Sequence, residues 1–170
     1  QDVVDMLNSV DQRKKKRFAI INMPDGTVNI RAVQGHSGAA ADQISNAMIQ
    51  EPYTPEHPKW KKVALHGTNR GAVPNILAEG LRPGGLRGPS SRQDVHMVNS
   101  VNETGETAGV RSNSTVIIRV NVAMMHERGM KMYYSAQGVI LSEGDPELTA
   151  RGLASSPADC MIGAFDQFTG

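Results

Sequence analysis

The chain has 170 residues, a formal net charge of +1 and 39% hydrophobic residues, values that are ordinary for a globular protein of one domain or two small lobes. No apolar run approaches the roughly 20 residues that a membrane-spanning helix needs. No secretory signal pattern is present, and a single cysteine, Cys160, rules out an internal disulfide. We therefore expect an intracellular protein, cytoplasmic or nuclear, without a membrane partner; the sequence does not predict its oligomeric state.

The beginning of the chain predicts a small lobe. Apolar residues recur at helical spacing over residues 2–10. Residues 18–21 and 28–32 have the character of short strands, joined by a turn with the sequence Asn-Met-Pro-Asp-Gly. A helix followed by a hairpin is typical of the C-terminal part of a winged-helix unit, which we place at residues 1–47. The proline-rich residues 48–58 then form an expected linker.

Five consecutive cations at residues 13–17 precede the first of these strands. Clustered lysine and arginine bind nucleic-acid phosphates because their binding releases condensed counterions. The expected RNA phosphate contacts in this run are Lys14, Lys15, Lys16 and Arg17. Since aromatic residues are few, no stacking platform for bases is evident, and recognition would proceed through phosphates. A solvated cationic turn or a localisation signal is the alternative interpretation.

The remaining residues, 59–170, predict a lobe that contains both strands and helices. Expected strands cover residues 62–66, 95–98, 115–122, 132–134 and 139–142, and expected helices cover residues 72–79 and 123–128. The Gly/Pro/Ser/Arg-rich residues 82–93 form an expected loop. The predicted fold class is therefore α+β, with a split β-sheet rather than a regular doubly wound one.

Two short motifs combine groups that suit phosphate-rich ligands. Residues 30–37, with the sequence Ile-Arg-Ala-Val-Gln-Gly-His-Ser, gather an arginine, an amide and an imidazole around a glycine. His66, Gly67 and Thr68 end an apolar run. Because Gly67 has no side chain, a planar ligand could approach its main chain, whose N–H and C=O can pair with a carboxamide. A tight turn at a strand end is the alternative explanation of this triplet.

Two arginines stand in unusual surroundings. Arg31 lies within an apolar alternation, and Arg111 follows a glycine-containing segment directly before the strongest expected strand. A guanidinium presents a planar fork for bidentate phosphate binding, although an isolated surface arginine remains the alternative for each. The sequence has no metal-ligand spacing, Walker loop or serine nucleophile elbow, so we expect no metal.

These motifs, in this order, resemble the NAD-dependent RNA 2′-phosphotransferases. The resemblance depends on residues 30–37, on Leu-His-Gly-Thr at 65–68, on Gly-Val-Arg at 109–111 and on Gly-Val-Ile-Leu at 138–141. It extends over nearly the whole chain, to about residue 150. The family joins an RNA lobe of winged-helix type to a lobe with the ADP-ribosyltransferase fold, which agrees with the two lobes expected from the sequence pattern.

The resemblance implies a two-step reaction with NAD as co-substrate and 2′-phosphorylated RNA, in particular tRNA from splicing, as partner. The RNA 2′-phosphate attacks the nicotinamide ribose and releases nicotinamide. The ribose 2″-hydroxyl then attacks the phosphate and expels the RNA 2′-hydroxyl, which yields ADP-ribose 1″,2″-cyclic phosphate. Both steps need charge neutralisation at a crowded phosphate and alignment of the reactants.

The resemblance also assigns roles to residues. Arg31 and Arg111 match the catalytic arginines of the family. The positions that match its NAD contacts are His66, Gly67, Thr68, Arg92, His96, Ser135 and Gly138. His36, within the motif at residues 30–37, joins the basic run as an expected contact to RNA phosphate.

Several positions depart from the family pattern. Asp94, Tyr134 and Gln137 stand where the family has a histidine, an arginine and an asparagine. An adjacent Arg-His pair of the family has no match in this chain, and the sequence does not tell whether an upstream segment carries it. Two alternatives follow: an ADP-ribosyltransferase that modifies phosphorylated nucleic-acid ends without the second step, or a non-catalytic module that binds NAD or RNA.

Overall fold

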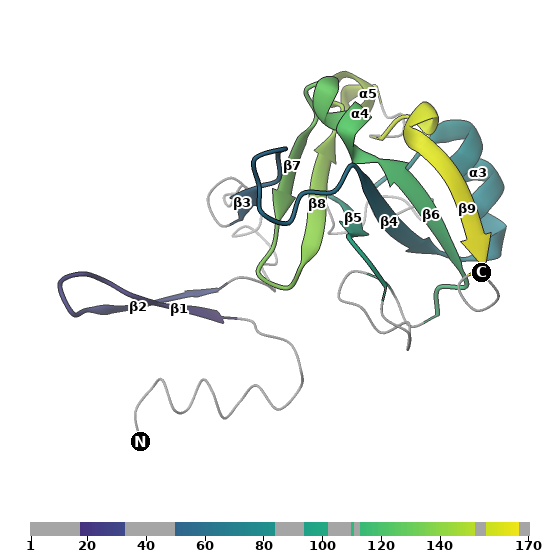
Figure 1. Ribbon diagram of the computed structural model, residues 1–170. Helices are drawn as coiled ribbons and strands as arrows, with labels where there is room; N and C mark the ends of the chain where they lie inside the picture. The colour runs from purple at the N-terminus through teal and green to yellow at the C-terminus, as the bar shows by residue number, and fades with distance from the viewer. Residues whose placement is uncertain are drawn as a thin grey trace. The chain divides into compact units, whose positions relative to one another are not determined.

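A computed structural model describes residues 18–32, 50–83, 94–101, 110, 113–151 and 156–166 (Figure 1). The chain divides into two compact units, Gln1–Ile49 and Gln50–Gly170, and each unit is described by itself. The expected helix at residues 2–10 lies outside the described residues. No helix in the described part of the chain combines the length and the apolar character that crossing a bilayer requires.

The described part of the first unit is a β-hairpin, as predicted. Strand β1 (Phe18–Asn22) pairs antiparallel with β2 (Val28–Ala32). The turn forms because Asp25 accepts hydrogen bonds from the backbone N–H and the hydroxyl of Thr27, at 2.9 and 2.6 Å. Gly26 adopts a φ of 84°, which a residue with a side chain rarely adopts. The Asn-Met-Pro-Asp-Gly signal therefore identified a turn with a clear local mechanism.

The second unit contains a seven-stranded sheet in the order β3-β7-β8-β5-β4-β6-β9, and every neighbouring pair is antiparallel. The strands are β3 (Glu51–Pro52), β4 (Val63–Thr68), β5 (Val95–Val98), β6 (Val116–Asn121), β7 (Lys131–Tyr134), β8 (Val139–Gly144) and β9 (Met161–Asp166). The five strands expected from the pattern are present. The two edge strands, β3 and β9, were not predicted.

Short helices accompany this sheet. They are η3 (Arg70–Ala72), α3 (Val73–Glu79), α4 (Val122–Glu127), α5 (Pro146–Ala150) and η5 (Ala158–Cys160). Helix α3 contacts β9 and η5, whereas α4 contacts β4 and η5 (Figure 1). The expected helices at residues 72–79 and 123–128 are confirmed as α3 and α4. The unit is thus a mixed α/β structure with an antiparallel sheet and few, short helices.

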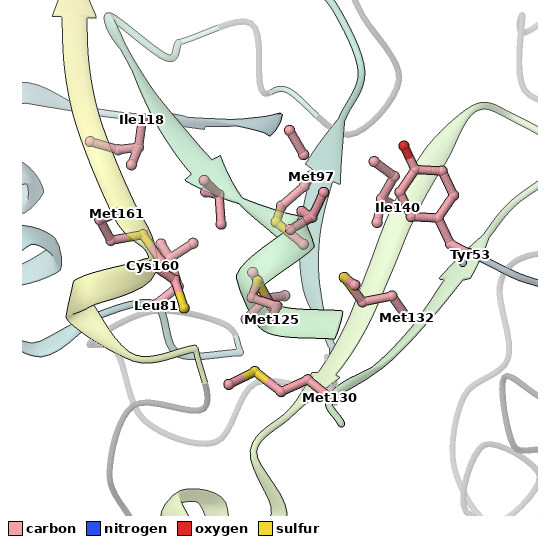
Figure 2. Packing of buried hydrophobic residues seen from close by; sticks show 14 of the residues in the cluster. Tyr53, Leu81, Met97, Ile118, Met125, Met130, Met132, Ile140, Cys160 and Met161 are labelled. Atoms are coloured by element: carbon pink, nitrogen blue, oxygen red, sulfur yellow. The ribbon is translucent and has the colours of Figure 1, made fainter. Parts of the chain in front are cut away.

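The core of the second unit lies on one face of the sheet (Figure 2). Alternate residues of the central strands supply it, among them Met97, Ile118 and Ile140, each fully buried. Met125 of α4 and Cys160 of η5 complete it from the helices. Burial raises the pKa of the Cys160 thiol, which is consistent with a structural rather than a reactive cysteine.

Part of the expected linker belongs to this core. Tyr53 follows β3 directly and is only 1% exposed. Its backbone N–H donates to the carbonyl of Met132 at 2.8 Å, which fixes the segment to β7. Prolines flank Tyr53 in the sequence and suggested an extended connection, but this single large aromatic side chain anchors the segment in the second unit.

Candidate functional site

The triplet His66, Gly67 and Thr68 forms the last three residues of β4, a central strand of the sheet. All three residues are partly buried. The carbonyl of Thr68 accepts a hydrogen bond from the N–H of Thr115 at 2.9 Å, which fixes the strand end to the segment before β6. The expectation that the triplet ends a strand is confirmed, and the site has a firm backbone support on the β6 side.

On its other side, β4 separates early from β5. Six residue pairs connect β4 with β6, whereas a single registered pair, Leu65↔Val98, connects β4 with β5. Beyond that pair, the imidazole Nδ1 of His66 hydrogen-bonds the backbone carbonyl of His96 at 2.8 Å. A side chain thus takes the place that a further ladder hydrogen bond would occupy between the two strands.

This hydrogen bond sets the tautomer of His66. A carbonyl oxygen can only accept, so Nδ1 must carry the hydrogen. In the neutral ring the lone pair is then on Nε2, which can accept a hydrogen bond from a hydroxyl group. His66 is therefore held in one ring orientation and one tautomer.

The two histidines do not lie on the same face of the sheet. His66 is opposite Ile118, whose side chain is in the core, so it lies on the core face. His96 alternates with the core residue Met97 along β5, so its side chain lies on the other face. The structure therefore joins the two predicted contacts through the backbone carbonyl of His96 rather than through its imidazole.

Gly67 has an explanation that the sequence did not suggest. A Cβ atom built on Gly67 would lie 2.5 Å from Cγ1 of Val110 and 2.9 Å from Oγ of Ser114. Such distances are far inside van der Waals contact, so the space beside this α-carbon is filled by the protein itself. From the sequence we expected a ligand to use that space.

Ser135 and Gly138 lie together in the tight turn between β7 and β8. The N–H of Ser135 donates to the carbonyl of Val139 at 2.8 Å, and the N–H of Val139 donates to Oγ of Ser135 at 3.0 Å. Gly138 has a φ of 80°, which favours glycine. Ser135 is 4% exposed, so its hydroxyl oxygen stabilises the turn and is not at the surface.

One strand connects these two groups of residues. β5 pairs with β4 through Val98, and it pairs with β8 along its whole length, from Val95↔Ser142 to Val98↔Val139. The strand end of β4 and the β7–β8 turn are therefore parts of the same sheet, separated by β5. The structure brings His66 and the His96 backbone into contact, whereas Ser135 and Gly138 lie in the turn before β8, which is two strands away from β4 in the same sheet.

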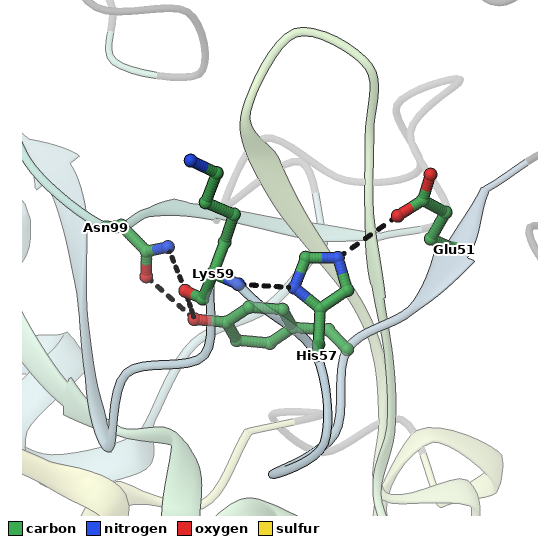
Figure 3. A network of polar contacts seen from close by, with 5 residues as sticks. Glu51, His57, Lys59 and Asn99 are labelled. Atoms are coloured by element: carbon green, nitrogen blue, oxygen red, sulfur yellow. Dashed lines mark hydrogen bonds and ion pairs between the residues drawn. The ribbon is translucent and has the colours of Figure 1, made fainter.

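A polar and aromatic network behind this turn was missed in the sequence (Figure 3). The hydroxyl of Tyr53 donates to Oδ1 of Asn99 at 2.7 Å and accepts from the N–H of Lys61 at 2.9 Å. The side-chain amide of Asn99 donates to the carbonyl of Lys59 at 2.7 Å. Burial raises the pKa of the Tyr53 phenol.

The same network reaches the turn through ring contacts. Tyr53 stacks on Tyr134 at a centroid distance of 5.6 Å, and His57 lies 4.8 Å from the Tyr134 ring. Nδ1 of His57 accepts from the N–H of Lys59 at 3.1 Å, and its Nε2 lies 3.2 Å from a carboxylate oxygen of Glu51. Tyr134 is thus held by packing against these two rings.

Other predicted site residues are outside the part of the chain that the structure describes. These are Lys14, Lys15, Lys16, Arg17, His36, Arg92 and Arg111. Arg31 is in β2, where its backbone pairs with Ala19. Among the described residues, no group of three His, Cys, Asp or Glu side chains is arranged to hold a metal ion.

The fold and site define a mixed α/β protein with a candidate ligand site at the end of a central antiparallel strand. A sequence model of the RNA 2′-phosphotransferase, Tpt1 / KptA family matches residues 2–144. The chain therefore belongs to this family. The motifs at residues 30–37 and 65–68, on which the resemblance depended, lie inside the matched range.

Individual relatives agree with the family match. The chain is 37% identical over 134 residues to a probable RNA 2′-phosphotransferase of Pectobacterium carotovorum, covering 78% of this chain and 61% of the relative. It is 36% identical over 132 residues to a probable RNA 2′-phosphotransferase of Streptomyces coelicolor, covering 78% of this chain and 60% of the relative. It is 26% identical over 168 residues to tRNA 2′-phosphotransferase 1 of Danio rerio, covering 94% of this chain and 70% of the relative. The chain thus spans about three fifths of the length of these bacterial relatives.

Proposed function

We propose that the protein removes a 2′-phosphate from RNA, tRNA in particular, with NAD as co-substrate. Family membership and the names of the relatives support the reaction class. The structural observation that carries the proposal is the hydrogen bond between His66 Nδ1 and the His96 carbonyl. It fixes the ring and sets the tautomer with the lone pair on Nε2, the atom that would accept a hydrogen bond from a ribose hydroxyl of NAD.

The main chain of Gly67 supports the same assignment. N–H and C=O groups alternate sides along an antiparallel strand, and the Thr68 carbonyl bonds on the β6 side. Those of Gly67 therefore face β5, on the side where the registered pairing ends at Leu65↔Val98. One donor and one acceptor on one residue match the two polar groups of the nicotinamide carboxamide. These residues fit NAD, which would supply the acceptor ribose for the phosphate.

The phosphate chemistry is assigned to the arginines. Arg31 and Arg111 would neutralise the 2′-phosphate, because a guanidinium binds two phosphate oxygens at once and keeps its charge at every physiological pH. The basic run at residues 13–17 and His36 would hold the RNA backbone.

In the same proposal, the first unit is the C-terminal part of a winged-helix-like RNA lobe, and the second unit has an ADP-ribosyltransferase-like split sheet.

The test is a reaction of the chain with NAD and an RNA that carries one internal 2′-phosphate. We expect release of nicotinamide, RNA with a free 2′-hydroxyl and a cyclic phosphate of ADP-ribose. The same RNA without the 2′-phosphate, and the reaction without NAD, are the controls. Stable ADP-ribosylated RNA would restrict the function to the first step. The proposal would be contradicted if nicotinamide were not released and NAD did not stabilise the protein against heat.

A further inference from the structure

Positive charge is concentrated in a short segment directly before β4. Residues 59–62, with the sequence Lys-Trp-Lys-Lys, form this cationic segment, and all three lysines are exposed. No Asp or Glu occurs from residue 57 to residue 78, whereas the rest of the chain has more acidic than basic side chains. None of the three lysines forms an ion pair with a described residue. The segment therefore presents three ammonium groups to the solvent within four residues.

Hydrogen bonds fix the backbone of the cationic segment. The N–H of Lys61 donates to the Tyr53 hydroxyl at 2.9 Å. The carbonyl of Lys62 accepts from the N–H of Ala123, in the first turn of α4, at 3.2 Å. The segment is therefore attached both to the buried tyrosine and to a helix, and its lysines are displayed from a fixed backbone.

The side chains of the segment divide between the protein and the solvent. The carbonyl of Lys59 accepts from the side-chain amide of Asn99 at 2.7 Å, whereas its ammonium group extends away from the polar network (Figure 3). The Trp60 ring lies 4.8 Å from the Tyr53 ring and contacts His126 edge to face at 5.7 Å. The tryptophan thus anchors the segment, and the lysines remain at the surface.

Two acidic side chains that precede the segment have partners of their own. Glu56 accepts a hydrogen bond from the Thr54 hydroxyl at 2.6 Å. A carboxylate oxygen of Glu51 lies 3.2 Å from Nε2 of His57. The positive charge of the segment is therefore available to an anionic group from solution.

We propose that the cationic segment binds the phosphodiester backbone of the RNA substrate, away from the reacting 2′-phosphate. Lys62 precedes β4 and Thr68 ends it, so at about 3.3 Å per residue the two are roughly 20 Å apart. This inference rests on the proposed function, in which the end of β4 binds NAD for reaction with the RNA. An RNA that reaches both places must extend beyond the reacting nucleotide, so the segment favours longer RNA.

The chemistry of the segment fits repeated phosphates rather than particular bases. A lysine ammonium is a point charge on a flexible stem, and contacts to phosphate carry no sequence information. Neutralising phosphates releases condensed counterions, so this binding weakens as the salt concentration rises. The affinity that the segment adds should therefore depend on RNA length and on salt, and little on RNA sequence.

The experiment compares two variants that each lose three exposed cations. The cluster variant combines Lys59→Gln, Lys61→Gln and Lys62→Gln. The dispersed variant is the matched control and combines Arg119→Gln, Lys131→Gln and Arg151→Gln, which lie in separate parts of the second unit. Each is assayed with an RNA long enough to extend along β4 that carries one internal 2′-phosphate, and with a 2′-phosphorylated dinucleotide.

The cluster variant should raise KM for the long RNA roughly tenfold and leave kcat unchanged. Both constants for the dinucleotide should stay as in the wild type. In binding titrations with the long RNA, the slope of log Kd against log salt should become flatter by about 0.7 for each lost phosphate contact. The dispersed variant should change each of these values much less.

Three results would overturn the inference. One is an equal loss of affinity for the long RNA in both variants, which would show an effect of net charge and no site. Another is a cluster variant with an unchanged salt slope, or with a rise in KM as large for the dinucleotide as for the long RNA. The third is loss of binding to phosphatidylserine vesicles with RNA binding unchanged, which would assign the segment to a membrane surface. A wild-type chain without NAD-dependent turnover refutes the proposed function, whereas the RNA-binding titrations still test the segment.

Discussion

The end of β4 and the turn between β7 and β8 each place a glycine beside expected NAD contacts, but for different physical reasons. Gly67 lies in a strand without a positive φ, and a side chain there would collide with Val110. Gly138 has a φ of 80°, and a Cβ there would meet only the Tyr134 hydroxyl, at 3.3 Å. Long-range packing therefore explains the glycine at position 67, and local turn geometry explains the glycine at position 138.

The two regions also differ in how they are stabilised. The end of β4 depends on backbone partners in adjacent strands, with His66 bonded to the His96 carbonyl. The β7–β8 turn depends on its own hydrogen bonds and on rings behind it, with Tyr134 stacked against Tyr53. We therefore expect substitutions at the strand end to change activity most, and substitutions behind the turn to change stability most.

The largest effect should come from His66→Ala. This change removes the Nε2 acceptor and the donor to the His96 carbonyl, and it should lower kcat/KM for NAD-dependent RNA dephosphorylation by about 100-fold. The measurement is the initial rate of nicotinamide release, with RNA saturating and the NAD concentration varied below KM. His126→Ala is the control. His126 lies in α4, where its ring contacts Trp60 edge to face, and its replacement should leave the rate unchanged. An unchanged kcat/KM in His66→Ala would remove the strand end from the active site.

Tyr53→Phe should act on stability instead. The change leaves the Lys61 N–H and Oδ1 of Asn99 without their partner, and each such loss in a buried place costs about 1–3 kcal/mol. The free energy of unfolding in urea measures it. Tyr134→Phe is the matched control, since it removes a hydroxyl with no hydrogen bond among the described residues. Equal losses in the two variants would show that the network contributes nothing specific.

The difference between local geometry and long-range packing also explains which features the sequence predicted. The β1–β2 turn, the central strands and helices α3 and α4 were predicted, because short-range periodicity and turn residues determine them. The role of Gly67 was not, because Val110 is 43 positions away in the sequence, counted from the printed numbering, and only the folded sheet brings it close. β3 and Tyr53 were missed because neighbouring prolines suggested a linker, whereas tertiary burial decided the outcome.

Gly138→Ala tests the local character of the turn. A positive φ costs a residue with a side chain about 1 kcal/mol relative to glycine, so the free energy of unfolding should fall by about that amount. Gly138→Asn should cost less, because asparagine tolerates this region of φ and ψ. The comparison of these two variants by denaturant unfolding separates torsional strain from crowding by Tyr134. If Asn, the larger residue, destabilises more than Ala, crowding and not φ explains the glycine.

The smallest expected effect is a dependence on alkaline pH that belongs to the network behind the turn. Burial raises the pKa of Tyr53 above its usual value, so the unfolded chain releases this proton first as the pH rises through about 10. The stability that protonated Tyr53 provides is complete below that pH and is lost as the pH rises toward the pKa of the folded state. The difference in unfolding free energy between wild type and Tyr53→Phe should therefore shrink between about pH 9 and pH 11.

Tyr133 also has a pKa raised by burial. Both proteins retain Tyr133, so its contribution cancels in the difference. A difference that stays constant over this range would mean that the Tyr53 phenol titrates alike in the folded and unfolded chain, and that its hydroxyl is more open to water than its contacts imply.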